Sequence, residues 1–263
     1  MNFFLVLLLT FTFSFSGYSQ IIKQQIPDKL VVLTFDDATE SHYSTVAPLL
    51  KKYGFGATFF VCEFPPNFKD STKYMNWRQI KALDNMGFEV ANHTRTHTGM
   101  SQLTKRQFRA ELKSIEHKCD SMNIVRPIAF AYPGYDLNES AFSVLQERGY
   151  EFARAGGSRV YNPLVDHPFL IPSWAMKSDN KKQIMNAFRQ AHNGKIVVLT
   201  VHGVPDIEHP WVSTPPALFK EYLQYLSENH FKVIAMRDLN KYINVKRARK
   251  IIVPDLNKEL KNY

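Results

Sequence analysis

Two adjacent carboxylates, Asp36 and Asp37, follow an apolar run that ends in Thr-Phe. Side chains of neighbouring strand residues point to opposite faces, so at the end of a strand the two carboxylates can take different tasks. One can bind a metal ion while the other exchanges protons. An Asp-Asp pair after a strand is also common as a turn or a helix cap, so the pair by itself leaves both interpretations open.

Two histidines, His93 and His97, are four residues apart in the segment His-Thr-Arg-Thr-His. One helical turn would bring both imidazoles to the same face, within reach of a single ion. Two imidazoles and one carboxylate form the ligand set of many hydrolytic metal sites, with positions left for water and substrate. The spacing alone is no metal signature, because the chain has nine histidines and such pairs arise by chance.

A third histidine, His202, follows the most apolar segment of the chain, Val-Val-Leu-Thr-Val. At the end of a buried strand its imidazole could donate a proton to a reacting group. The alternative is a buried structural histidine whose ring is satisfied by backbone groups.

The chain alternates short apolar runs, rich in branched and aromatic residues, with longer segments of helical spacing. This alternation is typical of repeated βα units. The predicted strands are residues 30–35, 57–62, 88–91, 128–131, 151–153, 169–171, 196–201 and 232–234. The predicted helices are residues 43–53, 77–86, 105–122, 139–148, 181–192 and 218–228.

Seven or eight βα units in one chain predict an α/β fold, an irregular (β/α) barrel of about seven parallel strands with helices outside. An open doubly wound sheet is the alternative. In both folds the chemistry belongs at the carboxyl ends of the strands, where the loops gather. The carboxylate pair and the three histidines all follow predicted strands, which supports a common site.

The order Thr-Phe-Asp-Asp, then His-Thr-x-Thr-His, then Leu-Thr-Val-His resembles the polysaccharide deacetylase family with its NodB homology domain, also known as carbohydrate esterase family 4. The resemblance spans about residues 30–240. It implies a metal-dependent hydrolase with Asp36 as general base and His202 as general acid. It also implies that Asp37, His93 and His97 bind a divalent ion, most often zinc.

The resemblance further assigns the oxyanion-binding N–H to Gly134 in the segment Phe-Ala-Tyr-Pro-Gly-Tyr. Two features depart from the family pattern: Ala131 stands where many members have an arginine that contacts the catalytic aspartate, and no Asp-Trp pair is present. We expect Arg154 to supply the missing cation. Asp166 or Asp206 could orient the histidine that acts as general acid.

Aromatic side chains are good surfaces for sugar rings, and three lie near the predicted rim. Tyr132, Trp174 and Trp211 are therefore the predicted substrate-binding aromatics, although each could instead pack against a neighbouring helix. Two histidines followed by proline, His167 and His209, are interpreted as loop residues rather than metal ligands.

The function that this sequence predicts is removal of N-acetyl groups from an amino-sugar polymer or oligosaccharide, a hydrolysis of carbon-nitrogen bonds other than peptide bonds. One alternative is an O-acetyl esterase that acts on a polysaccharide such as xylan. The other is a carbohydrate-binding protein that kept the fold without the activity. We expect a carbohydrate as the partner, and neither nucleic acid nor stable membrane insertion.

The segment 2–15 is an apolar run followed by small and polar residues, as in a signal peptide. We expect cleavage after residues 1–20, a single catalytic domain over 21–263, and a secreted or periplasmic protein of the cell envelope. An uncleaved membrane anchor is the alternative, although a span needs about 20 apolar residues.

The two cysteines, Cys62 and Cys119, are expected to be buried free thiols. The formal net charge is +9. Much of it lies in a basic cluster near the end of the chain, which a solvated helix face explains as well as a binding patch does. The members of this cluster are Lys241, Lys246, Arg247, Arg249 and Lys250.

Overall fold

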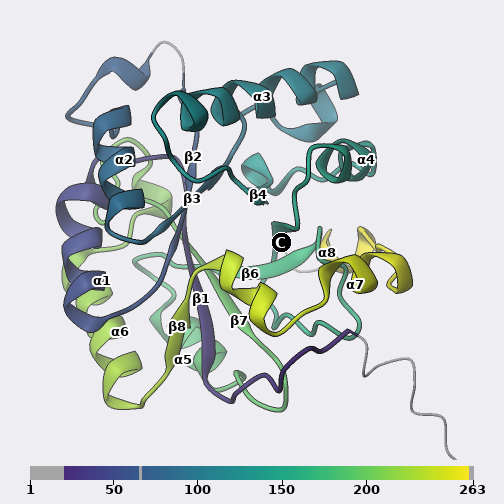
Figure 1. The fold of residues 1–263 in the computed structure, drawn as a ribbon. Helices are drawn as coiled ribbons and strands as arrows, with labels where there is room; N and C mark the ends of the chain where they lie inside the picture. The colour runs from purple at the N-terminus through teal and green to yellow at the C-terminus, as the bar shows by residue number, and fades with distance from the viewer. Residues whose placement is uncertain (1–20, 65–66, 261–263) are drawn as a thin grey trace, which may run out of the picture.

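The computed structural model describes residues 21–64 and 67–260 and contains a closed ring of parallel strands (Figure 1). Around the ring, β2, β3, β4, β5, β6, β7 and β1 follow one another, and β1 also pairs with β2. The strands are β1 (Leu30–Phe35), β2 (Thr58–Val61), β3 (Glu89–Asn92), β4 (Ala129–Ala131), β5 (Phe152–Gly157), β6 (Ile171–Ala175), β7 (Val197–Val201) and β8 (Lys232–Ile234). The predicted barrel of about seven strands is confirmed, and the open sheet is excluded.

Strand β1 closes the ring, and all six of its residues are buried. One edge of β1 pairs with β7 along its length. The other edge is divided, because its first half pairs with β8 and its last residues, Thr34 and Phe35, pair with β2. The carboxyl end of β1 therefore lies in the closed part of the ring, and the residues that follow it emerge on the rim.

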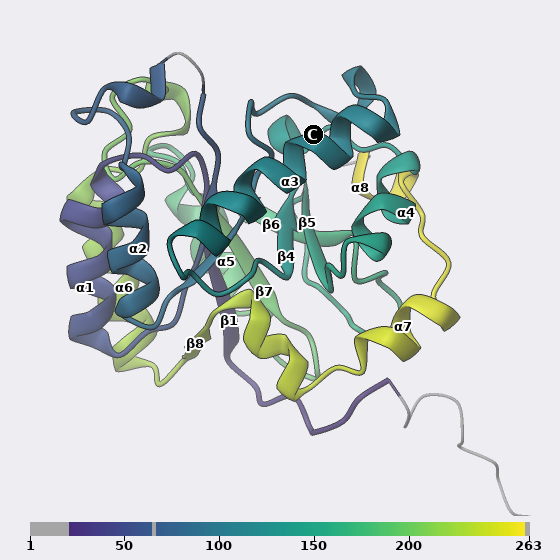
Figure 2. The same cartoon turned by 45° about the horizontal axis from the view of Figure 1, so that its top comes forward.

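Helices surround the ring and leave one rim open to the loops. Figure 2 shows α1, α2 and α6 together on one side of the strands, with α3 and α4 near one another on another side. The helices are α1 (Ala47–Tyr53), α2 (Trp77–Asn85), α3 (Lys105–Ser121), α4 (Ser140–Glu147), α5 (Lys181–Phe188), α6 (Pro216–Glu228), α7 (Val245–Ile251) and α8 (Asn257–Leu260). Each predicted helix has a counterpart, and a π-helical turn, His42–Val46, precedes α1.

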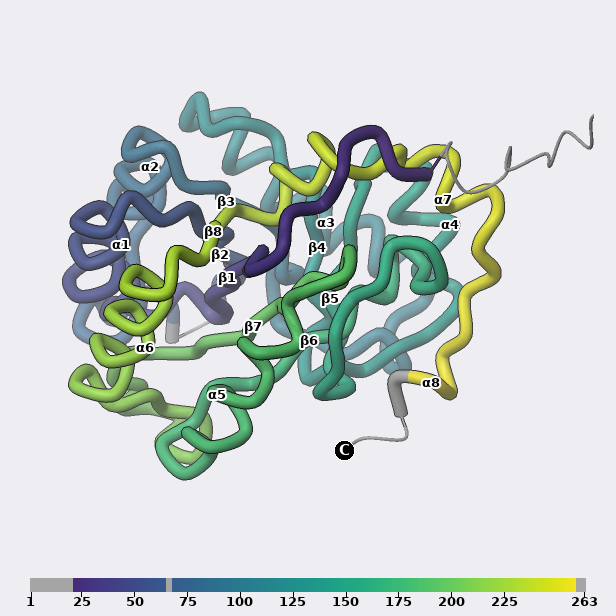
Figure 3. Tube along the Cα trace, turned by 90° about the horizontal axis from the view of Figure 1, so that it is seen from below, coloured from purple at the N-terminus to yellow at the C-terminus, as the bar shows by residue number. Residues whose placement is uncertain are grey.

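The segment that leads into α7 packs against the first described residues of the chain. Figure 3 shows these two segments side by side, and Ile22 forms an antiparallel bridge with Ile243. Four of the five residues of the predicted basic cluster lie on α7, a helix that the sequence pattern did not predict as a separate element. Within it, Arg249 donates a hydrogen bond to the backbone oxygen of Tyr150, so this cation is used in packing.

Strand β6 begins later than predicted, at Ile171 instead of residue 169. Alternation along β6 turns Ser173 toward the ring interior and Trp174 toward the helices. Trp174 is 3% exposed and belongs to the core cluster that also contains Ile184 and Phe188 of α5. The prediction that Trp174 binds sugar is therefore wrong, because its side chain is buried in the hydrophobic core.

A buried carboxylate lies at the amino-terminal end of the barrel. Glu89, the first residue of β3, accepts hydrogen bonds from the Thr58 hydroxyl and from the Arg237 N–H. The Thr58 oxygen in turn accepts the N–H of Met236. These contacts hold the start of the 3-10 helix Met236–Lys241 against β2 and β3. Burial raises the pKa of Glu89 to about 7, although its hydrogen bonds oppose the shift.

Both cysteines are buried and unbridged, as predicted. Within residues 21–64 and 67–260, no helix has the length and apolar character needed to span a bilayer. The predicted signal peptide, residues 1–20, lies outside the described residues.

Candidate metal centre and active site

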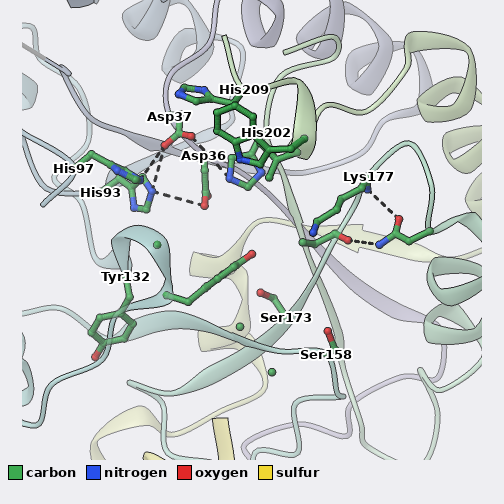
Figure 4. A pocket seen from close by; sticks show the side chains of 18 of the residues that line it. Asp36, Asp37, His93, His97, Tyr132, Ser158, Ser173, Lys177, His202 and His209 are labelled. Atoms are coloured by element: carbon green, nitrogen blue, oxygen red, sulfur yellow. Dashed lines mark hydrogen bonds and ion pairs between the residues drawn. The ribbon is translucent and has the colours of Figure 1, made fainter. Parts of the chain in front are cut away.

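Three strands deliver the predicted catalytic residues to the carboxyl-terminal rim (Figure 4). Asp36 and Asp37 follow β1, His93 follows β3, and His202 follows β7. The Asp36 N–H bonds to the Val201 oxygen, so the ladder between β1 and β7 continues to the first catalytic residue. The pairing of β1 with β7 therefore fixes the position at which the Asp36 side chain leaves the sheet.

Asp37, His93 and His97 converge at one point on this rim. Oδ1 of Asp37 lies 3.4 Å from Nε2 of His93 and 3.4 Å from Nε2 of His97. One ligand atom from each residue lies within 4.8 Å of the other two. Two of the three backbones are in the left-handed region, with φ of 75° at Asp37 and 56° at His97. Such conformations cost free energy and are found where a site requires them.

Hydrogen bonds and neighbouring charges set the orientation and the charge of these residues. Nδ1–H of His93 donates to the Ala131 oxygen at 2.9 Å, since a carbonyl only accepts, and Nε2 therefore faces the site. Although burial lowers the pKa of His93, the carboxylates of Asp36 and Asp37 raise it above its usual value. Burial and the nearby His93 lower the pKa of His97 to about 4, so its ring is neutral. Although burial raises the pKa of Asp37, the surrounding imidazoles hold it below its usual range.

Two buried atoms in this group make no hydrogen bond to any described residue, namely Oδ1 of Asp37 and Nε2 of His93. Buried polar atoms without partners are costly, and a bound ion would satisfy both. Two imidazole nitrogens and one carboxylate oxygen are ligands that zinc accepts in a catalytic geometry. The residues present therefore fit a divalent metal ion.

The second carboxylate, Asp36, is paired with Arg154, as the sequence predicted. Nη2 of Arg154 donates to Oδ2 of Asp36, and neither side chain is appreciably exposed. Arg154 lies on β5 directly opposite Ala131 of β4 in the sheet register. Facing positions on neighbouring strands point to the same side, so the small side chain at Ala131 leaves room for the guanidinium. In the family pattern the arginine stands at the position of Ala131, on β4. In this chain the arginine lies on the neighbouring strand, β5.

A directed chain of hydrogen bonds fixes Arg154. Its Nη1 donates to Oγ1 of Thr200 at 2.8 Å. Ser173 donates its only hydroxyl hydrogen to the Ala155 oxygen, so in the 2.8 Å contact between the two hydroxyls Thr200 must be the donor. The chain runs from Arg154 through Thr200 and Ser173 to a backbone oxygen, and each hydroxyl both accepts and donates.

His202 lies on the opposite side of Asp36 from His93 and His97 (Figure 4). Its Nε2 is 3.8 Å from Oδ2 of Asp37. Its backbone oxygen accepts Nε2–H of the buried His42 at 3.0 Å. Burial lowers the pKa of His42 to about 4, so this ring is a neutral donor that fixes the backbone of His202.

Neither carboxylate predicted to orient His202 does so. Asp166 binds Arg159 and Lys258 on a loop away from the ligand cluster. Asp206 accepts backbone N–H groups of its own loop, including that of Gly203. Both predictions are wrong because Asp206 holds its own loop and Asp166 joins its loop to α8, and no ion pair joins either to His202 among the described residues.

The cluster lines a cavity of about 600 Å³ on the rim. Of the predicted substrate contacts, Gly134 and Trp211 line it, and Trp211 is 69% exposed. Tyr132 also lines it, but its hydroxyl donates to the Phe169 oxygen and its ring points away from the Asp-His cluster in Figure 4. Tyr132 therefore contributes to the wall rather than a free aromatic face.

Other residues of the cavity were not predicted as substrate contacts. Tyr135, Lys177 and Asn180 line it, as does His209, whose ring lies 5.4 Å from that of Trp211. Lys177 and Asn180 follow β6. Because the sequence pattern placed the end of that strand too early, at residue 171, these two residues were not predicted to lie on the rim. A correct end for β6 would have placed them on the rim.

Comparison with known proteins gives a consistent result. Residues 23–153 match the family model described as polysaccharide deacetylase. The chain is 38% identical over 194 residues to a bifunctional xylanase/deacetylase of Pseudobutyrivibrio xylanivorans, covering 68% of this chain and 27% of that protein. It is 26% identical over 125 residues to a peptidoglycan-N-acetylglucosamine deacetylase of Bacillus cereus, covering 47% and 55%. The matches thus span about a quarter to just over half of these relatives.

The fold comparison agrees. The crystal structure of the Xyl-CE4 domain of a multidomain xylanase, from the hindgut metagenome of Trinervitermes trinervoides, aligns with a TM-score of 0.57 and 21% identity. The alignment covers 81% of this chain and 90% of that domain. At this identity the likeness concerns the barrel fold.

Proposed function

The chain belongs to the polysaccharide deacetylase family, and on this premise we propose that it is a metal-dependent hydrolase that removes N-acetyl groups from an amino-sugar polymer or oligosaccharide. The proposed ion is zinc, and the proposed location is outside the cytoplasm, in the periplasm or the medium. The observation that carries the proposal is the convergence of Asp37, His93 and His97 beside a second carboxylate that Arg154 holds.

Asp37, His93 and His97 would hold the divalent ion, which supplies Lewis-acid polarisation of the acetyl carbonyl and acidification of water. Asp36 is suited to the role of base, because Arg154 occupies Oδ2 while Oδ1 makes no hydrogen bond to a described residue. Oδ1 can therefore accept the proton of the attacking water.

His202 would donate a proton to the leaving nitrogen. An amine leaves poorly without this proton, so the carbon-nitrogen bond breaks only as the nitrogen is protonated. The oxyanion of the tetrahedral intermediate can accept the N–H of Gly134, which lines the cavity. Water adds to the carbonyl carbon, and the products are acetate and the free amino sugar.

Hydrolysis of O-acetyl esters is the second candidate. It is favoured by the similarity to the bifunctional xylanase/deacetylase, at 38% identity over 194 residues. The same base and acid can act on an ester, whose alcohol leaves more readily than an amine.

Acetate release separates the two candidates. The purified protein, with and without added zinc, is assayed on N-acetylchitohexaose and on acetylated xylan. Greater kcat/KM on the first supports N-deacetylation, and greater kcat/KM on the second supports the esterase. Glycan binding without acetate release from either would identify a non-catalytic binding protein and would refute the proposal.

Metal content tests the ligand assignment. His97→Ala should lower bound zinc and acetate release together, because His97 supplies one of three ligand atoms. His117→Ala removes an exposed histidine of α3 and serves as the matched control, with both quantities unchanged. Undiminished metal content in His97→Ala would contradict the assignment.

A further inference from the structure

The cavity has two chemically different walls. One carries the carboxylates and histidines of the proposed reaction. The other is formed after β5 and β6 by Gly157, Ser158, Ser173, Lys177 and Asn180. Lys177 is the residue on this second wall that the proposed reaction does not use.

Lys177 points into the cavity. In Figure 4 it lies beyond His202 as seen from His93 and His97, and its side chain extends back toward His202. It is partly buried, and in the described part of the chain no carboxylate forms an ion pair with its ammonium group. Its ammonium group is therefore available to a ligand that enters the cavity.

The backbone below Lys177 is fixed before any ligand binds. Oδ1 of Asn180 accepts the Lys177 N–H at 2.9 Å. Nδ2 of Asn180 donates to the Ala175 oxygen at 2.7 Å and to Oε1 of Gln183. The side-chain amide of Asn180 is thus used to hold the turn. The N–H donors of the Lys177 ammonium group face the cavity.

The other buried cation of the site is already used. Arg154 is bound to Asp36 and Thr200, beneath the reacting groups. The cavity volume of about 600 Å³ lies within the range of about 300–1000 Å³ typical of ligand pockets. An acetylated sugar at the Asp-His cluster therefore leaves room for a second substituent or sugar toward Lys177.

From this arrangement we infer that Lys177 selects glycans that carry a carboxylate next to the acetylated sugar. This inference rests on the proposed function, since it concerns the same cavity. A lysine ammonium is a compact point charge that pairs with a single carboxylate and gives a charge-assisted hydrogen bond. The carboxylate can come from a uronic acid branch or from the lactyl ether of a muramic acid.

Binding measurements test the inference independently of catalysis. Titration calorimetry compares an oligosaccharide bearing glucuronic acid on xylose units with the same oligosaccharide lacking the acid. A second pair compares a disaccharide of N-acetylglucosamine and N-acetylmuramic acid with N,N′-diacetylchitobiose. The wild-type protein should bind at least one acidic ligand about tenfold more tightly than its neutral counterpart, and the pair that shows the difference identifies the source of the carboxylate.

Lys177→Gln should abolish this preference by lowering the affinity for the acidic ligand to that of its neutral counterpart. Lys177→Arg should retain most of it. Lys182→Gln is the matched control, because it removes an exposed lysine at the start of α5 that does not line the cavity. Equal affinity of the wild type for acidic and neutral ligands, or an equal preference in Lys177→Gln, would overturn the inference.

Activity separates failure of this inference from failure of the proposed function. Acetate release without preference for acidic glycans leaves the proposed function standing and refutes the role of Lys177. A Lys177-dependent binding preference without acetate release from any acetylated glycan supports the role of Lys177 and refutes the proposed activity.

Discussion

The barrel holds buried carboxylates at both of its ends, and their surroundings differ. At the amino-terminal end, Oε2 of Glu89 is held by a hydroxyl and a backbone N–H, and it lines no described cavity. At the carboxyl-terminal end, Asp36 and Asp37 border a cavity. All three carboxylates have one buried oxygen without a hydrogen-bond partner among the described residues, so the cavity is what distinguishes the two ends.

The difference indicates that the carboxylate at the amino-terminal end stabilises the fold and that the carboxylates on the rim take part in the proposed reaction. The contacts of Glu89 join β2, β3 and the 3-10 helix that follows β8, so it stabilises the region where β8 meets the ring. The rim carboxylates instead line a cavity that a ligand can enter. In barrels of this kind the two ends generally divide stability and catalysis in this way.

The largest expected effect comes from Asp37→Asn, which preserves the shape of the side chain and removes a charged ligand. Catalytic zinc contributes several kcal/mol to the transition state, so kcat/KM should fall by at least about 10³-fold. Zinc content should fall with it, as measured by elemental analysis. Glu89→Gln, the same change at the other end of the barrel, should keep kcat/KM within twofold. Similar losses in the two variants would break the comparison.

His202→Ala should lower kcat by about 10²- to 10⁴-fold, the usual contribution of a general acid. Zinc content should stay unchanged, because His202 is not one of the three converging ligands. Steady-state kinetics and elemental analysis on one preparation check both points. Loss of zinc in this variant would instead make His202 a ligand.

Arg154→Ala should destabilise the protein by about 3–5 kcal/mol, because it leaves the buried Asp36 charge unpaired. Urea unfolding measures the change. The double variant Arg154→Met/Asp36→Asn removes the unpaired charge and should recover most of the stability without recovering activity. If the single variant unfolds like the wild type, the pair is not the buried ion pair that the structure shows.

Glu89→Gln should change how stability depends on pH. The carboxyl pKa is about 7 in the folded chain against 4.5 for the unperturbed group, chiefly because of burial. Since the folded value is the higher one, its stabilising effect is complete below pH 4.5 and is lost as pH rises through 7. Relative to Glu89→Gln, the wild type should lose on the order of 3 kcal/mol of unfolding free energy between these limits. Parallel pH profiles for the two proteins would refute this.

Thr200→Val should have the smallest effect, about 1–2 kcal/mol in unfolding free energy, because it removes the hydroxyl between Arg154 and Ser173. Activity should fall modestly through looser placement of Asp36. Thr200→Ser retains the hydroxyl and should behave like the wild type. A Thr200→Val variant with unchanged stability and kinetics would show that the hydrogen-bond chain does not hold Arg154.

Strand boundaries were predictable where the sequence pattern is simple. Strands β1 and β7 are apolar except for one threonine each, and their predicted ends placed Asp36, Asp37 and His202 on the rim. In β6, Pro172 and Ser173 interrupt the apolar run, so the strand was placed too early. That single error assigned Trp174 to the substrate surface and left Lys177 unrecognised.

By itself the sequence determined which residues stand at strand ends, because the period of apolar residues and the order of motifs are local properties of the chain. Only the tertiary structure decided which neighbours those residues have. Arg154 reaches Asp36, 118 positions away, through strand register. Asp206 is instead held by its own loop, and Asp166 by Arg159 and by Lys258 of α8. Which side chains pair depends on how the strands close into a ring. Closure brings together residues that are far apart in the sequence, so no local sequence pattern predicts the pair.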